Sequence, residues 1–158
     1  MQSKLLITTA VAAVALVASA CGGSTPSTAS SSPSPSVAAS AATIAVASNS
    51  LGQILVDGKG MTVYLFVADH STASTCYTSC AQVWPPVLTT GAPLAGTGAT
   101  ASLLGTTKRT DGKTEVTYNG HPLYYFVTDK KPGDTTGQGV TSFGEIWYVM
   151  SPAGAAIH

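Results

Sequence analysis

Apolar and polar positions alternate along much of the chain from about residue 43. Two short runs of this kind cover residues 44–47 and 53–56, and a third apolar run covers residues 61–67. The sequence Asp-Gly-Lys-Gly at residues 57–60 separates the last two runs. A period of two places successive side chains on opposite faces of a strand, and Gly and Asp are typical of the turns between strands. The pattern therefore predicts short β-strands.

The second half of the chain shows the same pattern more clearly. Three runs cover residues 106–110, 113–118 and 121–127, and the pairs Asp-Gly and Asn-Gly separate them. These pairs favour tight hairpin turns because both turn residues need a positive φ. The segment is therefore predicted to form a three-stranded antiparallel meander.

The polarity of each run predicts its burial. Residues 63–67 and 123–127 are apolar on both faces, which is typical of central strands that are covered on both sides. In the run 113–118, by contrast, Glu115 and Thr117 share one face. We expect that face to contact solvent.

A six-residue motif occurs twice. Residues 64–69 and residues 124–129 both read Tyr-x-Phe-x-x-Asp, 60 positions apart. A Gly precedes each motif at the same distance, and a Trp follows each, at Trp84 and Trp147. Repetition in one order indicates a duplicated structural unit. The motif residues are Tyr64, Phe66, Asp69, Tyr124, Phe126 and Asp129.

These patterns predict an all-β, antiparallel domain over residues 43–154, in which two tandem repeats are related by a pseudo-twofold axis. Repeat one covers about residues 43–90 and repeat two about residues 103–154. We expect residues 83–88 to close repeat one and residues 146–150 to close repeat two, and the Tyr, Phe and Trp side chains to form a shared core. No run shows a convincing helical period.

The N-terminus has the features of an export signal. Lys4 precedes an apolar stretch over residues 5–17, and small residues then lead to Cys21. This arrangement predicts a signal peptide over residues 1–20, and the apolar stretch is too short for a permanent membrane span. The small residues before Cys21 resemble a lipobox, in which the Cys becomes a diacylated N-terminus. The alternative is ordinary cleavage that leaves a free Cys.

The residues after Cys21 predict a spacer. From residue 22 to residue 42 the chain contains only Gly, Ser, Thr, Pro, Ala and one Val. Such a composition buries too little apolar area to offset the entropy of ordering, so residues 21–42 are expected to form a lipidated, disordered tether.

The charge distribution excludes one class of partner. Charged residues make up 9% of the chain, the formal net charge is zero, and the basic residues are scattered. Nucleic-acid binding requires clustered cations that neutralise phosphates, so no nucleic-acid partner is expected. The sequence also indicates no cofactor.

Cys76 and Cys80 form a C-x-x-x-C pair, which differs from the C-x-x-C spacing of thioredoxin-like sites. If lipid takes Cys21, this pair remains in a compartment that permits a disulfide, and a structural disulfide is the preferred interpretation. The alternative is copper handling, because thiolates, thioethers and imidazoles are copper ligands. Other candidate ligands are His121 and Met61, at equivalent repeat positions, and His70.

Taken together, the tandem motifs, the Cys76-x-x-x-Cys80 pair followed by Trp84-Pro-Pro, and residues 118–126 resemble bacterial lipoproteins known as the secreted repeat of unknown function. The resemblance extends over roughly residues 43–154. It implies a location and an architecture rather than an activity.

Asp69 and Asp129 follow apolar strands, where a carboxylate can accept backbone N–H bonds and fix the next loop. The alternative is an acid pair or a cation site. We expect a non-enzymatic lipoprotein on the outer face of the cell membrane that contacts an envelope protein or a small ligand. The alternative function is redox or copper handling through Cys76 and Cys80.

Overall fold

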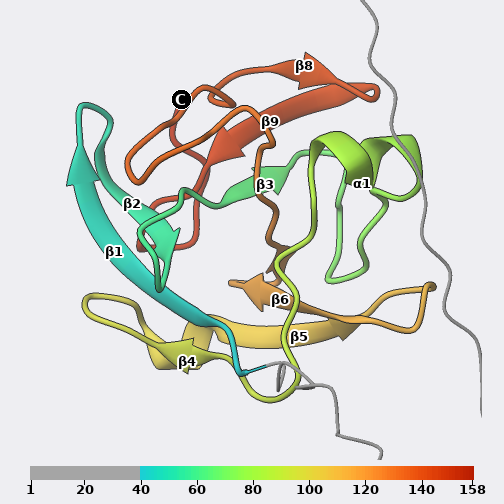
Figure 1. Ribbon diagram of the computed structural model, residues 1–158, viewed down its shortest axis with the longest axis horizontal. Helices are drawn as coiled ribbons and strands as arrows, with labels where there is room; N and C mark the ends of the chain where they lie inside the picture. Colours follow the sequence, from blue (N-terminus) through green and yellow to red (C-terminus); the bar gives the residue numbers. More distant parts are fainter. Residues whose placement is uncertain (1–39) are drawn as a thin grey trace, which may run out of the picture. The chain divides into compact units, whose positions relative to one another are not determined.

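The computed structural model describes residues 40–158 (Figure 1). The predicted signal peptide, Cys21 and the tether up to residue 39 lie outside the described residues. The described chain contains strands, one short α-helix and one 3₁₀ turn. Their bounds are β1 Thr43–Asn49, β2 Gly52–Asp57, β3 Tyr64–Phe66, α1 Ser79–Val83, β4 Leu94–Ala95, the 3₁₀ turn Ala101–Leu103, β5 Leu104–Lys108, β6 Thr114–Tyr118, β7 His121–Pro122, β8 Thr141–Ser142 and β9 Glu145–Val149.

The strands form three small sheets with the orders β2-β1-β4, β3-β9-β8 and β5-β6-β7. All pairs are antiparallel except the two-residue contact between β1 and β4. The predicted all-β, antiparallel class is therefore confirmed, and so is its division into two repeats.

The two repeats meet at the tyrosines of the duplicated motif. The backbone N–H of Tyr64 donates to the carbonyl of Tyr124 (2.8 Å), and the N–H of Tyr124 donates to the carbonyl of Tyr64 (3.0 Å). A reciprocal pair between equivalent residues is what a twofold relation produces. The pseudo-twofold axis thus passes between these two residues.

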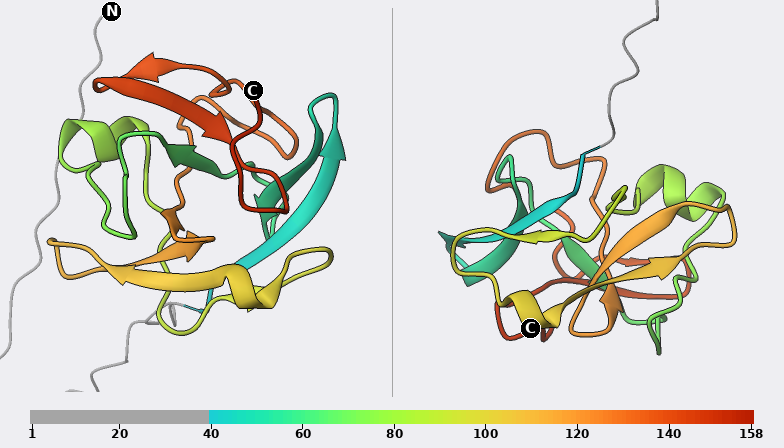
Figure 2. Two further views of the ribbon diagram at one scale, coloured as in Figure 1. Left: turned by 180° about the vertical axis from the view of Figure 1, so that it is seen from behind. Right: turned by 90° about the horizontal axis from the view of Figure 1, so that it is seen from below.

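The closing strands are exchanged between the repeats, which corrects the expectation from sequence. β9 belongs to repeat two but pairs with β3 of repeat one, with Phe66 opposite Trp147. Figures 1 and 2 show β3 beside β9. In the same way Tyr124 of repeat two bridges Pro86 of repeat one. Sequence order suggested closure within each repeat, but pairing across the pseudo-twofold gives each apolar strand a partner.

The prediction for β6 was also wrong. Glu115 and Thr117 are buried rather than solvated. β6 is a central strand, because β5 lies on one side and the N–H groups of Val116 and Thr89 link it to the chain around residue 87 on the other. The face that carries Glu115 is covered by the loop that contains Ser74 and Cys76, which the side chain of Arg109 contacts.

The helix α1 was not expected from sequence. It has only five residues and buries only Cys80, so it shows no periodic apolar stripe. The disulfide between Cys76 and Cys80 spans four residues and so constrains the chain at the start of this helical turn, and the N–H of Trp84 closes the turn on the carbonyl of Cys80 (2.7 Å).

The predicted aromatic core consists of a stack of four rings. Trp84 and Trp147 lie at its centre, 4.0 Å apart and nearly parallel. Phe66 stacks on Trp147 and Phe126 stacks on Trp84, so each Phe covers the Trp of the other repeat. Tyr64 and Tyr124 contact the edges of Trp84 and Trp147. The core is shared between the repeats.

We predict that Trp147→Ala lowers the free energy of unfolding by roughly 3–5 kcal/mol, because it removes the central contacts of this stack. Phe143 is a matched control, since it lies in the β8–β9 turn and is 46% exposed. Phe143→Ala should change the same quantity by less than about 0.5 kcal/mol. Urea unfolding of the two variants measures both values, and equal effects would contradict the stacked core.

Candidate functional site

The aspartates of the duplicated motif lie in equivalent turns. The backbone N–H of Asp69 donates to the carbonyl of Phe66, and that of Asp129 donates to the carbonyl of Phe126, at 3.0 and 3.1 Å. Both aspartate side chains are buried. They leave the apolar strand in a turn, as the sequence predicts.

One carboxylate oxygen of each Asp holds the following loop. Asp69 Oδ1 accepts hydrogen bonds from the backbone N–H and hydroxyl of Thr75, at 2.8 and 2.6 Å. Asp129 Oδ1 accepts the same pair from Thr136, at 3.0 and 2.6 Å. This is the loop-fixing role expected of a turn carboxylate.

The other oxygen of each Asp binds the tyrosine of the opposite repeat. Tyr124 donates its hydroxyl proton to Asp69 Oδ2 (2.5 Å), and Tyr64 donates to Asp129 Oδ2 (2.6 Å). Burial raises the pKa of both tyrosine hydroxyls far above the ordinary value, and the neighbouring carboxylates raise it further. The hydroxyls therefore remain proton donors. We call these two bonds the Tyr–Asp locks; sequence analysis missed them, because a motif shows its members but not their partners.

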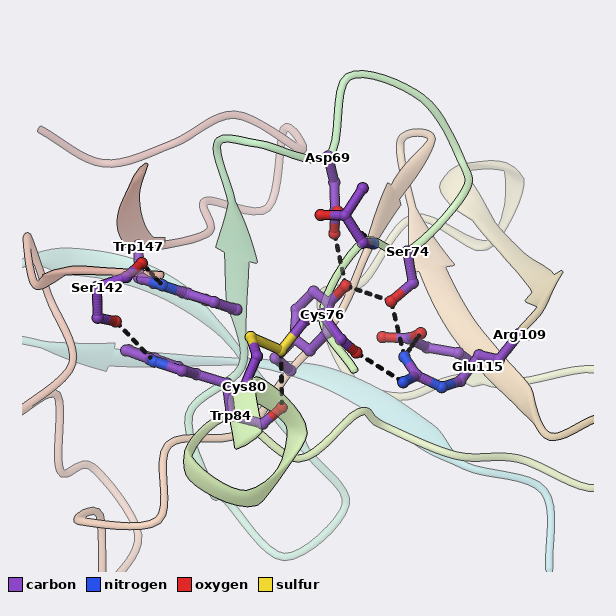
Figure 3. Close-up of a disulfide and its surroundings, with 11 residues drawn as sticks. Asp69, Ser74, Cys76, Cys80, Trp84, Arg109, Glu115, Ser142 and Trp147 are labelled. Carbon is purple, nitrogen blue, oxygen red and sulfur yellow. Dashed lines mark hydrogen bonds and ion pairs between the residues drawn. A yellow bond between two sulfur atoms is a disulfide. The ribbon is translucent and has the colours of Figure 1, made fainter. Parts of the chain in front are cut away.

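The two locks have different surroundings. The Tyr64 hydroxyl accepts a bond of 3.3 Å from the Gly137 N–H. The Tyr124 hydroxyl instead lies 2.7 Å from Ser74 Oγ. Ser74 Oγ in turn accepts a bond of 2.7 Å from Arg109 Nη1 (Figure 3). Because the single Tyr124 proton is directed to Asp69, Ser74 donates to Tyr124. A directed hydrogen-bond chain thus runs from Arg109 to Asp69.

Arg109 also binds the buried Glu115. Its Nη1 lies 2.6 Å from Glu115 Oε2, its Nη2 donates to the Cys76 carbonyl (2.7 Å), and its guanidinium lies over the ring of Tyr77. Burial raises the pKa of the Glu115 carboxyl to about 7, although Arg109 acts in the opposite direction. Sequence analysis missed this pair because a single Glu in an alternating strand is typical of a solvated face.

The cysteines form a disulfide that is packed into the core. Cys76 and Cys80 are bonded to each other, and both are buried. The Cys76 sulfur lies 3.8 Å from the Trp84 carbonyl. Figure 3 shows the disulfide between the two tryptophans and the Arg109–Glu115 pair.

The other proposed copper ligands lie elsewhere. His121 lines a surface pocket of about 450 Å³ together with His70 and Asp69. Met61 lies in the turn before β3, where its backbone N–H donates to Asp57 Oδ1. Among residues 40–158 no group of three or more His, Cys, Asp or Glu side chains is arranged to hold a metal ion.

The surface also contains two hollows that share Leu88 and Ser40. The larger, of about 510 Å³, extends to the turn with Gly112 and Lys113. The smaller, of about 280 Å³, extends to Lys59 and Tyr125. We call the two hollows together the Leu88 groove. The described chain enters the domain here, where the Ala42 N–H donates to the Thr89 hydroxyl (3.1 Å).

The family described as secreted repeat of unknown function matches the chain twice, at residues 45–88 and 105–151. Each match contains one Tyr-x-Phe-x-x-Asp motif. The chain belongs to this family. No curated protein and no solved structure matches the chain.

Membership gives the secreted repeat protein an extracytoplasmic location. Within the described residues no helix is long and apolar enough to cross a membrane.

We predict that Tyr124→Phe destabilises the secreted repeat domain by about 1–3 kcal/mol, because a buried carboxylate then loses a donor. Tyr64→Phe should have a similar or smaller effect, since within residues 40–158 the second partner of its hydroxyl is a backbone N–H rather than a side chain. Tyr148→Phe is the control: the Tyr148 side chain contacts the His158 ring and makes no hydrogen bond within residues 40–158. Chemical denaturation measures all three, and a Tyr124 variant as stable as the control would contradict the locks.

The disulfide is predicted to stabilise the fold by restricting the conformations of the unfolded chain. Cys76→Ser combined with Cys80→Ser should lower stability by about 2 kcal/mol, because the bond closes only a short loop. Mass spectrometry of the unreduced wild type should find no free thiol at either position. Free thiols there, or an unchanged unfolding midpoint in the double variant, would contradict a stabilising bond.

Proposed function

We propose that this protein is a lipid-anchored extracytoplasmic binding module without enzymatic activity, and that the Leu88 groove receives an envelope protein or a small ligand. The observation that carries the proposal is the groove itself, which combines an exposed apolar centre with polar and cationic ends. Pockets with apolar walls and a few placed polar groups are typical of ligand sites.

The chemistry of the groove favours contact with a partner. Leu88 is 41% exposed at its centre, and Lys113, whose side chain is 60% exposed, lines one end. At the other end the Tyr125 hydroxyl donates to Asp57 Oδ2 (3.1 Å), which fixes the ring beside Lys59. An apolar centre with polar groups on both sides can provide affinity and orientation together.

The placement of the acids supports binding rather than catalysis. Both oxygens of Asp69 and of Asp129 accept hydrogen bonds that hold the fold. Glu115 is fully buried. These three carboxyl groups therefore serve the interior rather than a surface site in the groove.

Site-specific photo-crosslinking in the native envelope tests the groove. A photoreactive residue at position 88 should give a discrete adduct, and Lys113→Glu should weaken it by changing the charge at one end. Position 94 is the matched control, because Leu94 is 55% exposed on β4 and lines neither hollow. Equal adducts from both positions, or none from position 88, would reject the groove as the binding surface.

The lipid anchor rests on Cys21 and the small residues before it. Two acyl chains suffice for stable membrane attachment, whereas one chain binds only marginally. Cys21→Ser should release the protein into the medium or stop its processing, as seen by fractionation and intact-mass measurement. Unchanged membrane retention of the variant would argue against lipidation.

A redox or copper-handling role is the alternative, and the disulfide is the observation that favours it. In the oxidised form each sulfur is bonded to the other, so copper binding by Cys76 and Cys80 requires prior reduction. Titration of the reduced domain with Cu(I), with the Cys76→Ser, Cys80→Ser variant as control, distinguishes the two functions. Stoichiometric uptake by the wild type alone would favour the alternative.

A further inference from the structure

At one fully buried position the two repeats carry side chains of different polarity. Leu55 in repeat one accepts a bond from the Val63 N–H, and Val116 in repeat two accepts the matching bond from the Leu123 N–H. The residues that precede them, Ile54 and Glu115, are therefore equivalent, and both are 0% exposed. Repeat two thus places a carboxyl group where repeat one buries a hydrocarbon. Burying a carboxylate is costly unless it is fully paired.

Glu115 is only partly paired. Its Oε2 accepts a bond from Arg109, whereas its Oε1 is buried and has no hydrogen-bond partner. Asp69 belongs to the same network through Tyr124 and Ser74. The interior of this network therefore holds two carboxyl groups, Asp69 and Glu115, but one guanidinium. Asp111, the third acid near Arg109, lies at the surface with a side chain 36% exposed.

The three other ionisable groups in the network, Asp69, Tyr124 and Arg109, are less suited to take up a proton. Both carboxylate oxygens of Asp69 already accept hydrogen bonds, three in all, from Thr75 and Tyr124. The Tyr124 hydroxyl is already protonated, and the Arg109 guanidinium keeps its charge at any ordinary pH. Glu115 is the carboxyl group with an unpaired buried oxygen, and burial raises its pKa above the ordinary value. A proton on Glu115 removes the excess negative charge, and Oε2 can still accept from Arg109.

We propose that Glu115 is a proton-binding site that controls how firmly the loop of residues 69–80 is held on the domain. Arg109 connects this site to the loop, because it donates to Ser74 Oγ and to the Cys76 carbonyl and lies over the Tyr77 ring. With Glu115 protonated, the charges of Arg109 and Asp69 balance. With Glu115 ionised, the network carries an unbalanced negative charge, and the loop that covers it is less stable.

The direction of the pH dependence follows from linkage. The pKa of the Glu115 carboxyl is about 7 in the folded protein, above its ordinary value of 4.5. Between these values the folded protein holds a proton that the unfolded chain has released. The contribution to stability is therefore complete below about pH 4.5 and is lost as the pH rises through about 7.

Unfolding of the disulfide-intact mature protein tests the site. From about pH 5.5 to about pH 8 the unfolding equilibrium constant of the wild type should rise roughly ten- to thirtyfold. Glu115→Gln should remove this rise, because Gln is neutral at every pH. Asp111→Asn is the matched control, since it alters the exposed partner of Arg109 and should keep the rise. A wild-type slope that persists in Glu115→Gln would overturn the proposal.

Carbon NMR of wild-type Glu side chains keeps the test decisive if Glu115→Gln does not fold. The Glu115 carboxyl should titrate near neutrality, and the backbone amides of Ser74, Cys76 and Tyr77 should shift with the same midpoint. His70 and His121 line a pocket with Asp69 near the loop, so the Glu115 carboxyl signal is the deciding one. A Glu115 midpoint near the ordinary value, or loop amides that do not follow it, would refute the proposal.

Discussion

The fold depends on a hydrogen bond made twice, from the tyrosine of one repeat to the aspartate of the other. Each bond lies in the interior, where it is stronger than in water and where an unpaired carboxylate would be costly. Because the same Asp also holds the loop that follows it, each lock fixes a strand and a loop at once. The four-ring stack is held by the same arrangement, since Tyr64 and Tyr124 contact the edges of its two tryptophans.

Around this symmetric centre the two repeats differ in how they hold the loop that follows the motif Asp. Cys76 follows the Thr that binds Asp69, and Gly137 follows the Thr that binds Asp129, so the two positions correspond. A side chain at residue 137 would meet Trp84 at 2.8 Å and Tyr64 at 2.9 Å. Repeat two therefore keeps its loop close to the aromatic rings with a Gly. Repeat one fixes its loop with a disulfide and with Arg109, which also binds the buried Glu115.

Sequence reasoning succeeded where the signal was local or repeated. Alternation and the Asp-Gly and Asn-Gly pairs predicted strands and hairpins, and repetition predicted two related units with a shared aromatic core. It failed where partners came from elsewhere in the chain. β9 and the segment at Pro86 each pair with the other repeat, and no local pattern indicates that exchange. Glu115 is buried because a loop of the other repeat lies over it. The groove is also an arrangement in space, since its walls come from five separate segments.

The exchanged strands bear on how such a molecule could have arisen. A single repeat on its own would leave its central strand without the neighbour that β9 or the segment at Pro86 provides, and its tyrosine without a carboxylate. Two identical copies could supply these to each other as a symmetric homodimer. Joining them in one polypeptide makes the encounter independent of concentration, and frees each half to change alone. Charge could then enter one half of the interior while the other stayed apolar.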